Sequence, residues 1–148
     1  MLLDVRFAAR RADAAEVIAA AVEAKFAAGK GHRVIAAILG RPVTTVRGWL
    51  RAFTGSAARV MEWFTALVVR DAPDAVALWP KPSDSTPGAA LSALHAYAEA
   101  LRRRFGVIGI VPWVRAGIAA TGGRLFDRSF WAAGVQHESA LPAVMPAG

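Results

Sequence analysis

Apolar residues recur at helical spacing along most of the chain, and no stretch shows the convincing alternation of a half-buried strand. Glycine and proline stand between these stretches, where they end helices. The helices that the spacing predicts cover residues 13–28, 32–39, 43–53, 57–70, 89–105 and 112–120. We therefore expect an all-α protein: a three-helix helix-turn-helix bundle followed by a fourth helix, a Pro-rich linker and a small C-terminal helical region.

Composition divides the chain into five predicted parts. These are a flexible basic arm (1–12), a helix-turn-helix domain (13–70), a Pro/Ser linker (71–88), a C-terminal helical region (89–131) and a disordered tail (132–148). The first helix is expected to begin at Asp13, because Glu16 completes a capping box with it. The linker is expected because its four prolines cannot continue a helix.

The segment His32–Phe53, HRVIAAILGRPVTTVRGWLRAF, has the spacing of a helix-turn-helix. Ala36 is small where the second helix must cross the first, and Gly40 stands where the turn needs a positive φ. The residues expected to hold this motif together are Ile35, Ala36, Leu39, Gly40, Val46 and Trp49. The alternative is an ordinary helical hairpin, in which the same residues only fill a core.

The outward positions of the second helix carry small, hydroxylated or cationic residues, which suit a DNA groove. Arginine pairs bidentately with guanine, a threonine methyl contacts thymine, and glycine admits a close backbone approach. We expect base contacts from Thr44, Arg47 and Gly48. We expect phosphate contacts from Arg33, Arg41, Thr45 and Arg51.

Charge supports a nucleic-acid partner. The chain has a net charge of +7, and no acidic residue occurs between Glu23 and Glu62. That interval contains seven cations: Lys25, Lys30, Arg33, Arg41, Arg47, Arg51 and Arg59. A solvated helix face normally mixes both signs, whereas a one-signed stretch is typical of a surface that binds the phosphate backbone. Double-stranded DNA is therefore the predicted partner.

Two other partners stay open. A helical interaction module could bind an acidic partner protein, and Arg102–Arg104 beside Phe105 could attach the chain to an anionic membrane. Because one helix-turn-helix contacts few base pairs, a homodimer is expected, and residues 89–131 could form it. The alternative is that this region packs on the fourth helix of its own chain.

Enzymatic chemistry finds little support. The chain has no cysteine, and its three histidines are scattered without paired carboxylates. The glycine-rich Thr121–Arg124 lacks the strand that a phosphate loop requires. We expect no catalytic residues, no metal and no cofactor. No apolar run is long enough to span a bilayer, and charges interrupt any signal peptide. The predicted setting is cytoplasmic and nucleoid-associated, and the main interpretation includes no membrane partner.

The segment AEVIAAAVEAKFAAGKGHRVIAAILGRPVTTVRGWLRAF resembles an actinobacterial group of helix-turn-helix proteins of uncharacterised function, often described as transposase-like. The resemblance is strongest over Ala14–Arg70. It implies DNA binding through His32–Phe53 and a link with mobile elements, including a transposase or recombinase partner. Members often carry an upstream cysteine-containing segment similar to a zinc ribbon. This chain has no cysteine, so the resemblance implies a shortened member without zinc-dependent function.

Overall fold

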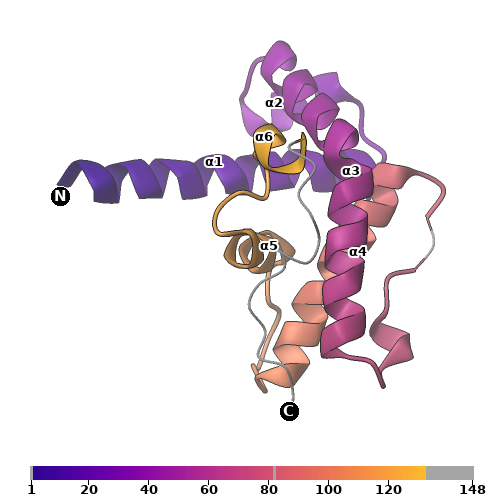
Figure 1. The fold of residues 1–148 in the computed structure, drawn as a ribbon. Helices are drawn as coiled ribbons and strands as arrows, with labels where there is room; N and C mark the ends of the chain where they lie inside the picture. Colours follow the sequence, from indigo (N-terminus) through magenta and orange to yellow (C-terminus); the bar gives the residue numbers. More distant parts are fainter. Residues whose placement is uncertain (1, 82, 133–148) are drawn as a thin grey trace. The chain divides into compact units, whose positions relative to one another are not determined.

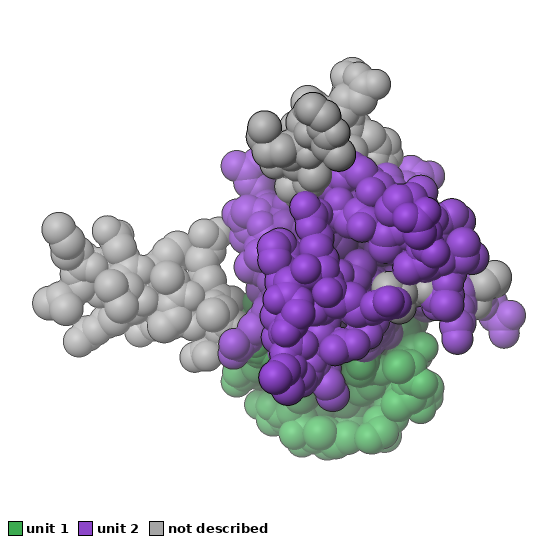
Figure 2. All heavy atoms as spheres, turned by 90° about the horizontal axis from the view of Figure 1, so that it is seen from below, with its two compact units in different colours: residues 1–54 green, residues 55–148 purple. Residues whose placement is uncertain are grey.

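The computed structural model describes the backbone of residues 2–81 and 83–132 and, apart from residue 78, their side chains from residue 14 onward. All regular structure in this part of the chain is helical, which confirms the all-α prediction (Figure 1). The helices are α1 (Leu2–Phe26), α2 (His32–Leu39), α3 (Val43–Asp71), the 3-10 helix η1 (Val76–Leu78), α4 (Thr86–Arg104), α5 (Trp113–Thr121) and α6 (Arg128–Ala132). The chain divides into two compact units, Met1–Thr54 and Gly55–Gly148 (Figure 2).

The first unit packs α1, α2 and the beginning of α3 around a small apolar core. Its buried members are Ala21, Ile35, Ala36, Val46 and Leu50. Ala24, Phe26, Leu39, Val43 and Trp49 are partly buried against them. The rings of Phe26 and Phe53 lie 5.9 Å apart, which adds an aromatic contact between α1 and α3. Each of the three helices therefore contributes to one core.

The second unit is held together by larger side chains. Phe64 on α3 contacts Tyr97 on α4, with ring centroids 5.3 Å apart. Trp63 packs edge-to-face on Trp131 of α6 at 5.8 Å. α5 lies against α4, and Gly117 permits this approach, since a Cβ there would stand 2.8 Å from Leu125 and 3.1 Å from Leu94.

The beginning of α1 differs from the prediction. Residues 2–12, expected as a non-helical arm, are the first turns of α1, and Asp13 lies inside the helix and not at its N-cap. The physical reason is local: the segment contains neither glycine nor proline and has several alanines, so nothing in it stops a helix. A capping box such as Asp13 with Glu16 favours a helix that begins there, but it does not prevent the helix from beginning at an earlier residue.

The break predicted after residue 53 is also absent, because α3 continues without interruption from Val43 to Asp71. Thr54 lies inside α3, and its hydroxyl donates a hydrogen bond to the Leu50 carbonyl at 2.8 Å, so this polar side chain finds a partner without leaving the helix. Gly55 costs only about 1 kcal/mol in a helix interior, which a long helix tolerates. The third and fourth predicted helices are therefore one helix.

The predicted linker is shorter and more ordered than expected. The Trp79 indole donates a hydrogen bond to the Ala72 carbonyl at 2.9 Å, and η1 lies between these residues. α4 begins three residues earlier than predicted, because the Ser85 hydroxyl caps it by accepting from the Gly88 amide at 3.1 Å. Of the predicted tail, Ala132 ends α6, and residues 133–148 lie outside the described residues.

Candidate nucleic-acid interface

The turn between α2 and α3 has the geometry that the sequence predicts. Gly40 adopts φ 63° and ψ 38°, the left-handed conformation that glycine takes without a Cβ penalty. Its amide donates to the Ala37 carbonyl at 3.4 Å, and the Arg41 amide donates to the Ala36 carbonyl at 3.0 Å. These bonds satisfy the last carbonyls of α2 and reverse the chain within three residues. A glycine-terminated turn therefore joins two packed helices.

The residues predicted to support the motif face the core of the first unit. Ile35, Ala36 and Val46 are buried, and Leu39 and Trp49 are partly buried against them. Ala36 and Val46 belong to different helices, so α2 and α3 meet through small and β-branched side chains. This packing fixes which face of α3 points outward.

That outward face carries four of the predicted DNA-contacting residues. Thr44, Arg47, Gly48 and Arg51 are all exposed, and their spacing places them on one side of α3. The fifth predicted residue of α3, Thr45, is half-buried. A Cβ added at Gly48 would meet no atom within 4 Å, so its backbone is open to an incoming ligand.

Two further predicted phosphate contacts lie outside α3. Arg33 is exposed in the first turn of α2, and Arg41 is exposed in the turn. The segment of residues 32–53 contains no acidic residue. Its exposed cations therefore face solvent with no carboxylate inside the motif to neutralise them.

The structure adds His32, which the predicted site does not include. A guanidinium nitrogen of Arg47 lies 3.1 Å from His32 Nε2. Because a guanidinium group can only donate, Arg47 is the donor of this hydrogen bond and the His32 ring is its acceptor. The bond joins the first residue of α2 to the outward face of α3. The two residues are 15 apart in sequence, and no local pattern connects them.

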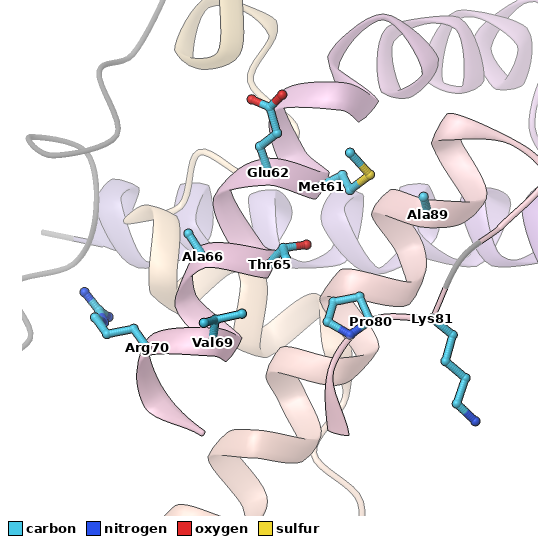
Figure 3. Close-up of a pocket in the computed structure, with 9 residues that line it drawn as sticks. All are labelled: Met61, Glu62, Thr65, Ala66, Val69, Arg70, Pro80, Lys81 and Ala89. Carbon is cyan, nitrogen blue, oxygen red and sulfur yellow. The ribbon is translucent and has the colours of Figure 1, made fainter. Parts of the chain in front are cut away.

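The second unit contains an open pocket of about 750 Å³, lined mostly by apolar atoms (Figure 3). Its lining residues are Met61, Glu62, Thr65, Ala66, Val69, Arg70, Pro80, Lys81 and Ala89. They include no histidine that could act as a base toward Thr65. The pocket is therefore an open, mainly apolar hollow whose lining includes the charged residues Glu62, Arg70 and Lys81.

Two features are absent from the described part of the chain, a metal-binding cluster and a membrane-spanning helix. No group of three or more His, Asp or Glu side chains is placed to bind a metal ion in the described part of the chain. Across the same residues, no helix combines the length and apolarity needed to cross a bilayer.

No protein-family model matches this chain, and no curated protein or solved structure shows significant similarity to it. The resemblance to the actinobacterial group stays a prediction. The functional assignment consequently depends on the residues and geometry of the chain itself.

Proposed function

We propose that the protein binds double-stranded DNA through the helix-turn-helix of its first unit, with residues 43–53 of α3 in the major groove. The observation that carries this proposal is the outward face of Thr44, Arg47, Gly48 and Arg51, presented beside a glycine turn. A major groove about 12 Å wide admits one α-helix. The exposed cations of residues 32–53 supply the charge that the phosphates require.

Base contacts are assigned to Thr44, Arg47 and Gly48. Arg47 lies 3.1 Å from His32 in the free protein, and on binding it exchanges this hydrogen bond for one to a guanine edge. Gly48 lets the helix backbone approach the base pairs closely.

Phosphate contacts are assigned to Arg33, Arg41, Thr45 and Arg51. Three of these are exposed arginines distributed over α2, the turn and α3, so they can reach different phosphates and fix the register of α3 in the groove. The half-buried Thr45 has less reach and would contact a phosphate only at the closest approach of the helix.

The biological role that follows is that of a transcription regulator or a mobile-element-associated DNA-binding protein without catalytic activity. We place it in the cytoplasm, at the nucleoid. A homodimer formed through residues 89–131 would supply the second recognition helix that tight sequence-specific binding requires. A transposase or recombinase is the further partner that this role allows.

The test begins by selecting bound sites from random duplex DNA and measuring affinity for the selected site. Arg47→Ala is expected to weaken binding by about 1–3 kcal/mol and to relax the preference at one base pair. Arg51→Ala is expected to weaken all sequences alike and to reduce the salt slope by about one unit. Arg128→Ala, which removes an exposed arginine of α6, is the matched control and should change neither quantity.

The proposal fails if the Arg47→Ala/Arg51→Ala double variant binds duplex DNA as tightly as the parent at low salt. An acidic polypeptide such as polyglutamate distinguishes the alternative partner class. A module for acidic proteins would retain polyglutamate in excess duplex DNA, whereas a DNA-binding protein would release it.

A further inference from the structure

The loop between α4 and α5 exposes four large apolar side chains. Their exposed fractions are 68% for Phe105, 43% for Val107, 99% for Ile108 and 93% for Ile110. Single exposed apolar residues are common on protein surfaces, but a contiguous group marks an interaction site or a membrane contact. Here the group occupies six consecutive positions of one loop (Figure 1).

Both ends of this loop are anchored by backbone hydrogen bonds. The Gly106 amide donates to the Arg103 carbonyl at 3.3 Å, and the Val107 amide donates to the Arg102 carbonyl at 3.0 Å. At the other end, Pro112 begins α5 by accepting from the Ala116 amide at 3.2 Å. The exposed aliphatic residues therefore lie on a short segment between two hydrogen-bonded helix ends, and they are not part of a chain terminus.

The charges on both sides of the loop have one sign. Between Glu99 and Asp127 the chain has no acidic residue, and it carries five arginines: Arg102, Arg103, Arg104, Arg115 and Arg124. Arg102 pairs with Glu99 at 2.6 Å, and Arg104 pairs with Asp71 at 3.4 Å. The Arg102–Glu99 pair is partly exposed and therefore weak, so Arg102 can exchange it for another anion. The Asp71 side chain is only 6% exposed, and it keeps Arg70 as a partner at 3.3 Å when Arg104 turns to another anion.

We propose that residues 105–111 insert into the interface of an anionic lipid bilayer, with Arg102–Arg104 at the lipid phosphates. Aliphatic tips flanked by arginines match the two layers of such a surface, its apolar interior and its negative headgroups. The Arg104 guanidinium already lies 5.6 Å from the centre of the Phe105 ring, so a cation and an apolar ring are adjacent at the loop's beginning.

A lipid surface suits this loop better than a second copy of the chain does. A second copy seated on this loop would bring Arg102–Arg104 of two chains together, so a homodimer through residues 89–131 would use other surfaces of that region. Ile108 is almost fully exposed, so burying it requires apolar contacts on all sides. The fluid acyl chains of a lipid bilayer can provide these contacts, because they adapt to the shape of the side chain. An anionic membrane is also one of the alternative partners that the sequence leaves open. The membrane proposal does not depend on DNA binding, because the loop belongs to the second unit and the helix-turn-helix to the first.

The test is co-sedimentation of the full chain with vesicles of phosphatidylglycerol and phosphatidylcholine, and with vesicles of phosphatidylcholine alone. Because the basic first unit is also expected to adsorb to anionic vesicles, partitioning is measured in about 0.15 M and about 0.5 M salt. The higher salt screens all exposed charges, Arg102–Arg104 included, and isolates the contribution of the aliphatic residues. Ile108→Ser/Ile110→Ser leaves every charge in place and is expected to lower partitioning into the anionic vesicles at least about tenfold. Val76→Ser, which replaces an apolar residue 64% exposed in η1, should leave partitioning unchanged.

A second measurement uses the absence of cysteine from the chain. Ile108→Cys carrying an environment-sensitive fluorophore is expected to shift to the blue with anionic vesicles, whereas labelled Val76→Cys should not. Equal partitioning of the parent and the double serine variant, or no shift at position 108, overturns the proposal. So does a parent that is dimeric without lipid and becomes monomeric in the double serine variant. The same variant should bind duplex DNA like the parent, which keeps this test separate from that of the first unit.

Discussion

Gly48→Ala is expected to stabilise the fold while weakening DNA binding. Gly48 is exposed on α3 and does not have a positive φ. A Cβ there meets no atom within 4 Å, so alanine fits the free protein without strain. Replacing a helical glycine by alanine contributes about 1 kcal/mol. For a chain of this size, that corresponds to a rise in the melting temperature of about 2–4 °C.

The same methyl group faces the DNA if α3 lies in the major groove as proposed. A methyl inserted into a closely packed contact costs about 1–3 kcal/mol, so affinity for the selected site should fall at least about fivefold. Gly55→Ala is the matched control, because Gly55 is exposed on the same helix and its added Cβ also meets nothing within 4 Å. It should raise the melting temperature similarly and leave affinity unchanged.

Thermal unfolding by circular dichroism and fluorescence anisotropy with a labelled duplex measure the two quantities. If Gly48→Ala raises the melting temperature and binds DNA as tightly as the parent, position 48 does not approach the bases, and its assigned role is wrong. If neither alanine variant raises the melting temperature, the expectation that alanine stabilises α3 at these two positions is wrong. Gly55 follows Gly48 by seven residues and lies on the same side of α3, so loss of affinity in both variants would extend the DNA contact along this side beyond residue 53.

Two predictions concern the second unit. Gly117→Ala should lower the free energy of unfolding by about 1–2 kcal/mol, although alanine has the higher helix propensity, because the new methyl meets buried Leu125 at 2.8 Å and Leu94 at 3.1 Å. Unchanged stability in urea unfolding would contradict this packing. Burial, followed by the nearby Asp71 carboxylate, raises the pKa of Tyr97 above its usual value of 10.0. The folded state therefore holds the phenol proton more tightly, and the stability this confers is complete below about pH 10 and is lost as pH rises through the folded-state pKa. Unfolding in urea from pH 8 to 11 should show this loss in the parent but not in Tyr97→Phe, whereas parallel curves would contradict it.

The sequence predicts the motif well where one residue controls the local backbone. Gly40 and Gly122 both adopt left-handed conformations at the ends of α2 and α5, where glycine is the residue that does so cheaply. The boundaries of α2 follow from such signals. Spacing alone likewise predicts that Val46 faces the core, because burial on an amphipathic helix repeats with the helical turn.

Prediction fails where a small local cost is outweighed by the helix as a whole. Residues 54–56 look like a break, yet the Thr54 hydroxyl finds an acceptor inside the helix and α3 continues. The contact between His32 and Arg47 depends on how two helices cross, which no local spacing specifies. The aliphatic run at 107–111 shows the same limit: a pattern alone does not reveal that Ile108 and Ile110 are exposed.

The two surfaces proposed here carry the same charge, so charge does not assign their partners. One lies within an acid-free interval between Glu23 and Glu62, and the other within an acid-free interval between Glu99 and Asp127. The neutral residues between the cations differ. On the outward face of α3 they are threonine and glycine, which suit hydrogen-bonding base edges and close approach. On the α4–α5 loop they include phenylalanine, valine and isoleucine, whose transfer from water to an apolar environment is favourable. A polyanion with polar grooves therefore fits the first surface, and an anionic layer over hydrocarbon fits the second.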